Sequence, residues 1–120
     1  MAELGIDGDE VVLRLSALER LEALHGDLRA PRAAVRDVRV VDDAYAEVRG
    51  LRWPGTGIPG VLLAGTFRAR GTKTFAIVHG RPGGVRVVFD GGDYDEWVVG
   101  CDDPGAVADA LVAADMRRPE

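Results

Sequence analysis

The sequence predicts a mainly β protein with helices, of the α+β class, in which an antiparallel sheet is closed by a C-terminal amphipathic helix. Three observations lead to this class. Apolar and polar residues alternate in strand-length runs between positions 61 and 101. The connections between the runs are short and rich in glycine and aspartate, as antiparallel neighbours require. A helix-start signal then follows at Asp103 and Pro104.

Composition indicates a single domain over residues 1–120. No apolar run reaches the roughly 18 residues of a membrane-spanning helix, so we expect no integral membrane segment. The first residues, MAELGIDGDE, lack the basic and then apolar order of a signal peptide, and Cys101 is the only cysteine. Both features fit a reducing, cytoplasmic location. The net charge of −5 works against nucleic acid as a partner, and it leaves peripheral lipid contact open only through a local basic cluster.

The chain is expected to begin with a mobile lead over residues 1–10 and to end in a frayed segment over residues 116–120. Residues 11–15, VVLRL, form a short apolar run with one alternating face and predict a first strand. After a reset at Pro31, residues 34–41, AVRDVRVV, alternate over part of their length and predict another strand.

A short helix is predicted after Ser16, because Ser16 and Glu19 have the spacing of a capping box. Gly26 is placed to end this helix in a left-handed conformation. Three leucines lie on or near one face of the helix: Leu18, Leu21 and Leu24. Since so short a helix is marginal alone, we expect its leucine face to pack on the sheet as a lid.

The middle of the chain is less regular. The sequence does not decide whether residues 43–50 form a helix or a strand. The aspartates at 42–43 can cap a helical turn, while Tyr45 and Val48 also fit a strand. The stretch RWPGTGIPG at residues 52–60 is rich in glycine and proline. It predicts a loop that turns a barrel corner and feeds the central strand.

From residue 61 onward we expect a continuous antiparallel meander of strands about five to eight residues long. The turns between strands are RGT, GRPGG and DGGDYD. The first strand is expected to be half buried, with Thr66, Arg68 and Arg70 facing outward. The expected buried positions are Val61, Leu63, Phe67 and Ala69 in the first strand, Phe75 and Ile77 in the second, Val85, Val87 and Phe89 in the third, and Trp97, Val99 and Cys101 in the fourth.

The chain closes with a predicted helix in which Asp103 is the cap and Pro104 the first helical residue. Its apolar stripe consists of Val107, Ala110, Leu111 and Ala114. We expect this stripe to pack on the sheet or to plug the mouth of a barrel. The sequence leaves open whether the barrel is closed.

The second half of the chain resembles small bacterial proteins of the pleckstrin-homology-like kind. The similar pieces are PGTGIPG, GTFR, KTFAIVHG, VRVVFDG and YDEWVVGCDDPGAVADAL, which cover residues 52–111; the first half matches by element order alone. The resemblance implies a bent barrel that serves as a non-catalytic binding or assembly platform, often self-associating in bacterial members. The sequence departs from eukaryotic members because Trp53 and Trp97 both lie outside the closing helix.

One cluster of basic residues is a candidate ligand site. Arg68, Arg70 and Lys73 flank one predicted hairpin and together could hold a phosphate or an acidic peptide, because arginine offers a bidentate fork to oxyanions. The alternative is a solvated edge whose charges discourage pairing between sheets.

Other motifs have simpler explanations. Gly55, Gly57 and Gly60 match the dinucleotide pattern G-x-G-x-x-G, but a strand and not a helix is predicted to follow them. The acidic residues of one turn, which a calcium ion could in principle use, lack the order of an EF-hand and predict an ordinary acidic turn: Asp90, Asp93, Asp95 and Glu96.

Neither histidine, His25 or His79, has a serine or cysteine partner nearby in sequence, and Cys101 alternates with apolar residues as a buried, inert thiol would. We therefore expect no catalytic residue, metal or cofactor. The expected function is a non-catalytic pleckstrin-homology-like module that binds itself or a protein partner. The alternative is binding of a small anion or lipid headgroup by the basic hairpin, and a third possibility is a small enzyme with His79 or an acidic residue as its base.

Overall fold

The computed structural model describes residues 2–23, 25–48, 51–58, 62–69, 71–80 and 82–116, and of residues 51–58, 62 and 113–116 it describes the backbone. Some residues named in the sequence analysis lie outside the described residues: Leu24, Gly60, Val61, Arg70 and residues 117–120. The elements in chain order are β1 (Glu3–Asp7), β2 (Glu10–Arg14), α1 (Ala17–Ala23), β3 (Leu28–Pro31), the 3₁₀ turn η1 (Arg32–Ala34), β4 (Val35–Val41), α2 (Ala44–Glu47), β5 (Leu51–Ile58), β6 (Leu62–Ala69), β7 (Thr72–His79), β8 (Gly84–Phe89), β9 (Glu96–Gly100) and α3 (Pro104–Met116).

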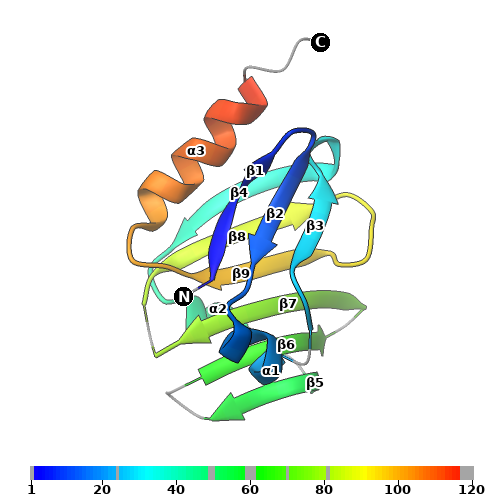
Figure 1. Ribbon diagram of the computed structural model, residues 1–120, viewed down its shortest axis with the longest axis vertical. Helices are drawn as coiled ribbons and strands as arrows, with labels where there is room; N and C mark the ends of the chain where they lie inside the picture. Colours follow the sequence, from blue (N-terminus) through cyan, green and yellow to red (C-terminus); the bar gives the residue numbers. More distant parts are fainter. Residues whose placement is uncertain are drawn as a thin grey trace.

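The strands form two sheets. The smaller has the order β1-β2-β3 and the larger has the order β4-β8-β9-β7-β6-β5. The small sheet lies over the large one, its strands crossing the others steeply, with α3 to one side and α1 to the other (Figure 1). Residues of both helices, Ala23 in α1 and Ala108 and Leu111 in α3, pack in the same core cluster as the small sheet. Both helices and the small sheet therefore share one face of the large sheet, here called the inner face. The mainly β class with helices is confirmed, and the described strands form two open sheets rather than a closed barrel.

The main hydrophobic core lies between the two sheets. Val11, Leu13 and Leu15 enter it from the small sheet, as their alternation predicted. From the large sheet come the predicted buried residues Val85, Val87, Phe89, Trp97 and Val99, together with Phe75 and Ile77. These strands were read correctly because one inward face per strand leaves a period of two in the sequence.

A second, smaller cluster lies on the outer face of the large sheet, where α2 packs. It consists of Ala44, Phe67, Ala76, Val78 and Val98. Asp43 begins α2 by accepting a hydrogen bond from the backbone N–H of Ala46 at 3.2 Å. The ambiguity over residues 43–50 is thus resolved as helix for residues 44–47.

The expected half-buried character of β6 is wrong, because this strand is buried on both faces. Phe67 packs in the outer cluster with Leu63 beside it, whereas Thr66 is buried on the inner side. The register pairs Phe67 with Thr74 and Thr66 with Phe75. Phe75 therefore faces the opposite side of the sheet from Phe67, since cross-strand partners share a face of the sheet.

The expected continuous meander is also wrong at one point. Strands β5, β6 and β7 follow one another antiparallel, but β9 lies between β7 and β8 and runs parallel to β7. Gly80, with φ of 72°, begins the connection that carries the chain past the position of β9. All five residues of β9 are buried, and a strand covered on both faces belongs in the interior of a sheet.

Three further strands were not predicted. Residues 3–7, expected as a mobile lead, form β1, and residues 28–31 form β3; both pair with β2. Residues 51–58, expected as part of a corner loop, form the edge strand β5, whose pairing with β6 is interrupted by an irregularity between Arg52 and Gly55. Glycine and proline are compatible with an edge strand that contains a bulge. The strand predicted over residues 34–41 is confirmed as β4.

The C-terminal helix begins at Pro104 as predicted, and Asp103 caps it by accepting from the backbone N–H of Ala106 at 3.2 Å. Its buried face differs from the predicted stripe, because Ala108 and Leu111 are buried while Ala110 is exposed. The helix bridges the gap between an edge of each sheet. None of the helices in the described part of the chain has the length and apolar character needed to cross a membrane.

Candidate functional site

Helix α1 is attached to the large sheet by its acidic face. Glu19, only 2% exposed, accepts a hydrogen bond from the backbone N–H of Ser16 at 2.9 Å, and Ser16 Oγ accepts from the N–H of Glu19 at 3.2 Å. The predicted capping box is confirmed. The second carboxylate oxygen of Glu19 lies 3.8 Å from Nδ1 of His79 on β7, and Nε2 of His79 lies 3.0 Å from Oε1 of Glu22. Both ring nitrogens of His79 therefore face carboxylates of α1, and the contact with Glu22 attaches α1 to β7.

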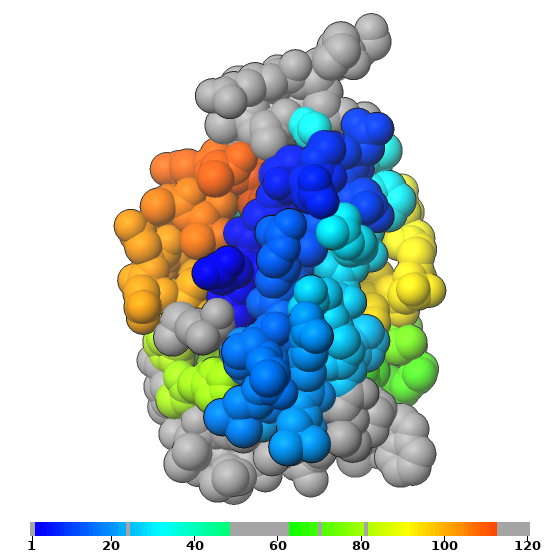
Figure 2. Space-filling model, viewed as in Figure 1, coloured from blue at the N-terminus to red at the C-terminus, as the bar shows by residue number. Residues whose placement is uncertain are grey.

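The leucines of α1 point away from the sheet. Leu18 is 64% exposed and Leu21 is 70% exposed, and α1 forms part of the outer surface (Figure 2). The helix does lie on the sheet, but the expectation that its leucine face packs there is wrong: the buried residues are Glu19 and Ala23. Gly26 does not take the left-handed conformation expected of it. Glu19 is turned inward, where one carboxylate oxygen accepts the capping hydrogen bond and the other, 3.8 Å from His79, has no hydrogen-bond partner among the described residues.

A further polar contact holds the chain on both sides of α1. Asp27 accepts hydrogen bonds from the backbone N–H of Leu15 at 2.8 Å and from Nη2 of Arg20 at 3.2 Å. The Leu15 N–H lowers the pKa of Asp27, and the charge of Arg20 acts in the same direction. The segment just before α1 is thereby tied to the segment just after it, which supports the outward placement of the leucines.

The structure places two of the three predicted ligand residues on one end of the β6–β7 hairpin. Arg68 and Lys73 are directly opposite each other in the register, and Arg70 lies outside the described residues. The ammonium of Lys73 lies 4.6 Å from the centre of the Tyr94 ring. Tyr94 in turn shares a hydrogen bond of 2.7 Å with Thr66. This aromatic neighbour comes from the β8–β9 connection, and the spacing around the hairpin carried no signal for it.

A polar network occupies the outer face of the large sheet beside α2. Arg86 donates to Glu96 from Nε at 2.5 Å and from Nη2 at 3.2 Å, and from Nη1 to Glu47 at 3.2 Å. Thr74 Oγ1 donates to Glu96 at 2.8 Å. The hydrogen bond to Glu96 raises the pKa of Arg86. Every nitrogen of this guanidinium thus has an acceptor, so the network is structural and offers no fork to a ligand.

The acidic turn does not gather its carboxylates around one point. Asp95 accepts a hydrogen bond from the backbone N–H of Lys73 at 2.7 Å, while Glu96 is directed to Arg86. Within the described ranges, no three side chains of the metal-ligating kinds come together as a possible metal site.

The glycine motif lies in a strand, and the cysteine is partly buried. Gly55 and Gly57 lie inside β5 and pair with β6, so the helix N-terminus that a dinucleotide would require does not follow them. Cys101 is partly buried, and burial raises the pKa of its thiol, with Asp102 and Asp103 adding to the effect. A raised pKa keeps the thiol protonated at neutral pH and unreactive as a nucleophile.

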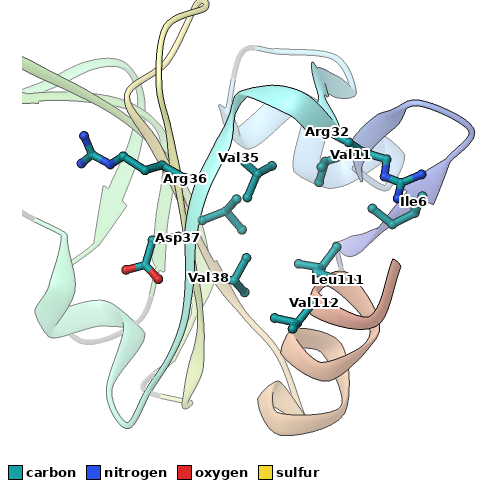
Figure 3. Close-up of a pocket in the computed structure, with 10 residues that line it drawn as sticks. Ile6, Val11, Arg32, Val35, Arg36, Asp37, Val38, Leu111 and Val112 are labelled. Atoms are coloured by element: carbon teal, nitrogen blue, oxygen red, sulfur yellow. The ribbon is translucent and has the colours of Figure 1, made fainter. Parts of the chain in front are cut away.

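A pocket of about 220 Å³ lies between α3 and β4, lined by aliphatic side chains together with Arg32, Arg36 and Asp37. Val35 and Val38 of β4 face Leu111 and Val112 of α3 across it (Figure 3). Its lining comes from β1, β2, η1, β4, β8 and α3. Sequence reasoning did not find this pocket, because no contiguous stretch carries more than a few of its residues.

A scan of protein-family models finds no match to this chain, and comparisons with curated proteins and with solved structures find none either. The geometry of the described residues is therefore the basis for the functional interpretation.

Proposed function

We propose that this chain is a non-catalytic binding and assembly module that associates with a second copy of itself through the outward face of α1. The observation that carries this proposal is the exposure of Leu18 and Leu21, which lie one turn apart on a helix whose buried side is acidic. Single exposed leucines are ordinary. Here two neighbouring leucines are turned outward while Glu19 is turned inward. This arrangement becomes favourable when a partner covers the leucines, because their apolar surface is then removed from water.

Three of the polar groups in the described part of the chain that could serve catalysis are engaged within the fold or kept protonated. His79 faces two carboxylates, Arg86 is held by Glu96 and Glu47, and Cys101 has a raised pKa. An acid, base or nucleophile must instead reach a substrate. This supports a module that binds and does not catalyse. A single cysteine is compatible with the proposed cytoplasmic location.

The pleckstrin-homology-like relationship to small bacterial proteins remains part of the proposal. It is supported by the order of early strands, the β5–β6–β7 meander and the closing helix α3 packed beside the large sheet. The parallel pairing of β7 with β9 departs from a continuous meander.

Self-association is tested by light scattering coupled to size-exclusion chromatography over a range of protein concentrations. We expect the wild type to form dimers, and the double substitution Leu18→Ser and Leu21→Ser to weaken dimerisation by at least about tenfold, since each contact loses buried leucine area. Val40→Ser is the matched control, because Val40 is 49% exposed but lies on β4. A wild type that stays monomeric throughout, or a double variant that dimerises equally well, would contradict the proposal.

A second candidate function is the binding of an oxyanion such as phosphate at Arg68 and Lys73. The specific observation is that these two cations are directly opposite each other across two strands, an arrangement that is destabilising unless something offsets the repulsion. Neither has an ion-pair partner among the described residues. A bound anion would offset the repulsion and explain the pairing.

Thermal unfolding in increasing inorganic phosphate at constant ionic strength tests this second candidate. We expect phosphate to raise the melting temperature of the wild type by a few degrees, and Arg68→Glu to abolish this rise. Arg36→Glu is the control, because Arg36 is exposed on the opposite edge strand β4. An equal rise in the wild type and in Arg68→Glu would exclude the site.

A further inference from the structure

Another pocket, of about 240 Å³, lies between β3 and the connection from β8 to β9. Strand β3 is an edge strand of the small sheet, and it lies beside this connection (Figure 1). The lining comes from the α1–β3 connection, β3, β8, the β8–β9 connection and β9. Leu18 and Leu21 do not belong to the lining, so the pocket is separate from the proposed interface on α1.

The described part of the lining contains four aromatic rings: His25, Phe89, Tyr94 and Trp97. The rings of Phe89 and Trp97 lie edge-to-face with their centres 4.7 Å apart, and those of His25 and Tyr94 do so at 6.1 Å. Phe89 and Trp97 are buried, whereas His25 is exposed. The first pair therefore lies at the base of the pocket and the second pair nearer its mouth. Rings in such pairs offer edges and faces to a further aromatic ring.

The lining also includes charged residues, and two of these are balanced within the fold. Arg29 donates to Asp7 at 3.2 Å and to Glu10 at 3.0 Å. Asp27 accepts from Arg20 at 3.2 Å, in addition to its hydrogen bond with a backbone N–H. Neither Arg29 nor Asp27 therefore adds an uncompensated charge to the pocket.

Two side chains in the described part of the lining keep free capacity to accept hydrogen bonds. The carboxylate of Asp93 is exposed and has no ion-pair partner among the described residues. Nδ1 of His25 lies 2.8 Å from the carbonyl oxygen of Gly26. Because a carbonyl oxygen only accepts, Nδ1 carries the hydrogen, and Nε2 of the neutral ring is an acceptor. A negative charge and acceptors favour a cationic ligand with N–H donors.

We propose that this pocket binds a small protonated aromatic amine, with its ring beside the aromatic side chains and its ammonium at Asp93. The volume of about 240 Å³ exceeds the roughly 150 Å³ of a cavity that takes up benzene, which leaves room for a ring with a short side chain. The ring of Tyr94 already has the ammonium of Lys73 at 4.6 Å from its centre, so the carboxylate and not this ring receives the charge of the ligand. The proposal does not depend on self-association through α1.

Titrations of the wild type with three matched compounds, followed by NMR, test the ligand class. We expect phenethylammonium to cause saturable shifts of the backbone amides of Gly91 and Gly92 and of the indole N–H of Trp97. The anion 3-phenylpropionate, with a similar ring and chain, should bind at least about tenfold more weakly, because it lacks the charge-assisted contact with Asp93. The saturated compound 2-cyclohexylethylammonium should bind about fivefold more weakly, because it cannot form aromatic pairs.

A substitution locates the charge. Asp93→Asn should weaken phenethylammonium binding about tenfold and leave the binding of 3-phenylpropionate no weaker than in the wild type. Asp109→Asn is the matched control, because Asp109 is exposed on α3 and does not line the pocket, and it should leave both affinities unchanged. The comparison of the three compounds on the wild type stands even if a variant fails to fold.

Three results would overturn the inference. Equal binding of phenethylammonium and 3-phenylpropionate, or unchanged binding in Asp93→Asn, would exclude the cationic class. Equal binding of 2-cyclohexylethylammonium would exclude recognition of the aromatic ring. The absence of saturable shifts with all three compounds would exclude the pocket as a ligand site. None of these results bears on dimerisation through Leu18 and Leu21, which light scattering measures independently.

Discussion

Replacing Gly84 with alanine is expected to destabilise the fold by about 3 kcal/mol. A Cβ atom at this position would lie 2.3 Å from the carbonyl oxygen of Val99 and 2.8 Å from the Cβ of Ala44. The first atom belongs to the backbone of the central strand β9 and the second to α2, so neither can retreat without moving a whole element. Gly84 is thus the position that lets α2 approach the outer face of the sheet.

The measurement is urea unfolding of Gly84→Ala against the wild type. Gly26→Ala is the matched control, because an added Cβ there would meet nothing within 4 Å and Gly26 has no positive φ. We expect the control to remain within about 0.5 kcal/mol of the wild type. Equal stability of the two alanine variants would show that the contact between α2 and β8 is not as close as described.

Removing the guanidinium with Arg86→Ala is expected to cost about 3 kcal/mol of unfolding free energy. Glu96 is 7% exposed and would keep only the hydroxyl of Thr74 as a partner. Removing one partner of a buried ion pair typically costs roughly 3–5 kcal/mol. The lower end of this range applies here because the Arg86 side chain is 30% exposed and water can reach part of the site.

A double-mutant cycle with Glu96→Gln distinguishes a buried charge from lost packing. The double variant should be more stable than Arg86→Ala alone, because the uncompensated charge is gone. Arg39→Ala is the control, since Arg39 pairs with Asp37 on the same face but its side chain is 68% exposed, and we expect it to change stability by less than about 0.5 kcal/mol. A loss below about 1 kcal/mol in Arg86→Ala would mean that the network is solvated.

The strands of the second half were predictable because their information is local. Val85, Val87 and Phe89 alternate with less buried residues, and this period of two is enough to assign one inward face to β8. The capping box at Ser16 and Glu19 is equally local, because its two hydrogen bonds span three residues.

The neighbours of each strand were not predictable from such patterns. The alternation in β9 shows that Trp97 and Val99 share a face, but it would be the same whether β9 followed β8 at the edge or lay between β7 and β8. The inserted, parallel arrangement is decided by burial of β9 on both faces, which depends on the small sheet and α2 together.

The candidate sites also have a part that the sequence predicted and a part that it did not. The basic hairpin was predicted, and Arg68 and Lys73 do lie side by side, because a tight turn fixes the register across it. Tyr94 beside Lys73 was not predicted, since it reaches the hairpin from the β8–β9 connection.

For this protein, the sequence by itself determined the mainly β class, the inward faces of several strands and the two helix starts, because periodicity and capping act over a few residues. Only the tertiary structure decided which face of α1 is outward. The leucines alone favour packing on the sheet, but Glu22 of the same helix lies 3.0 Å from His79, which comes 57 positions later in the chain. A contact that joins distant segments leaves no local pattern, so the sequence could not show that the leucines are on the exposed side of α1.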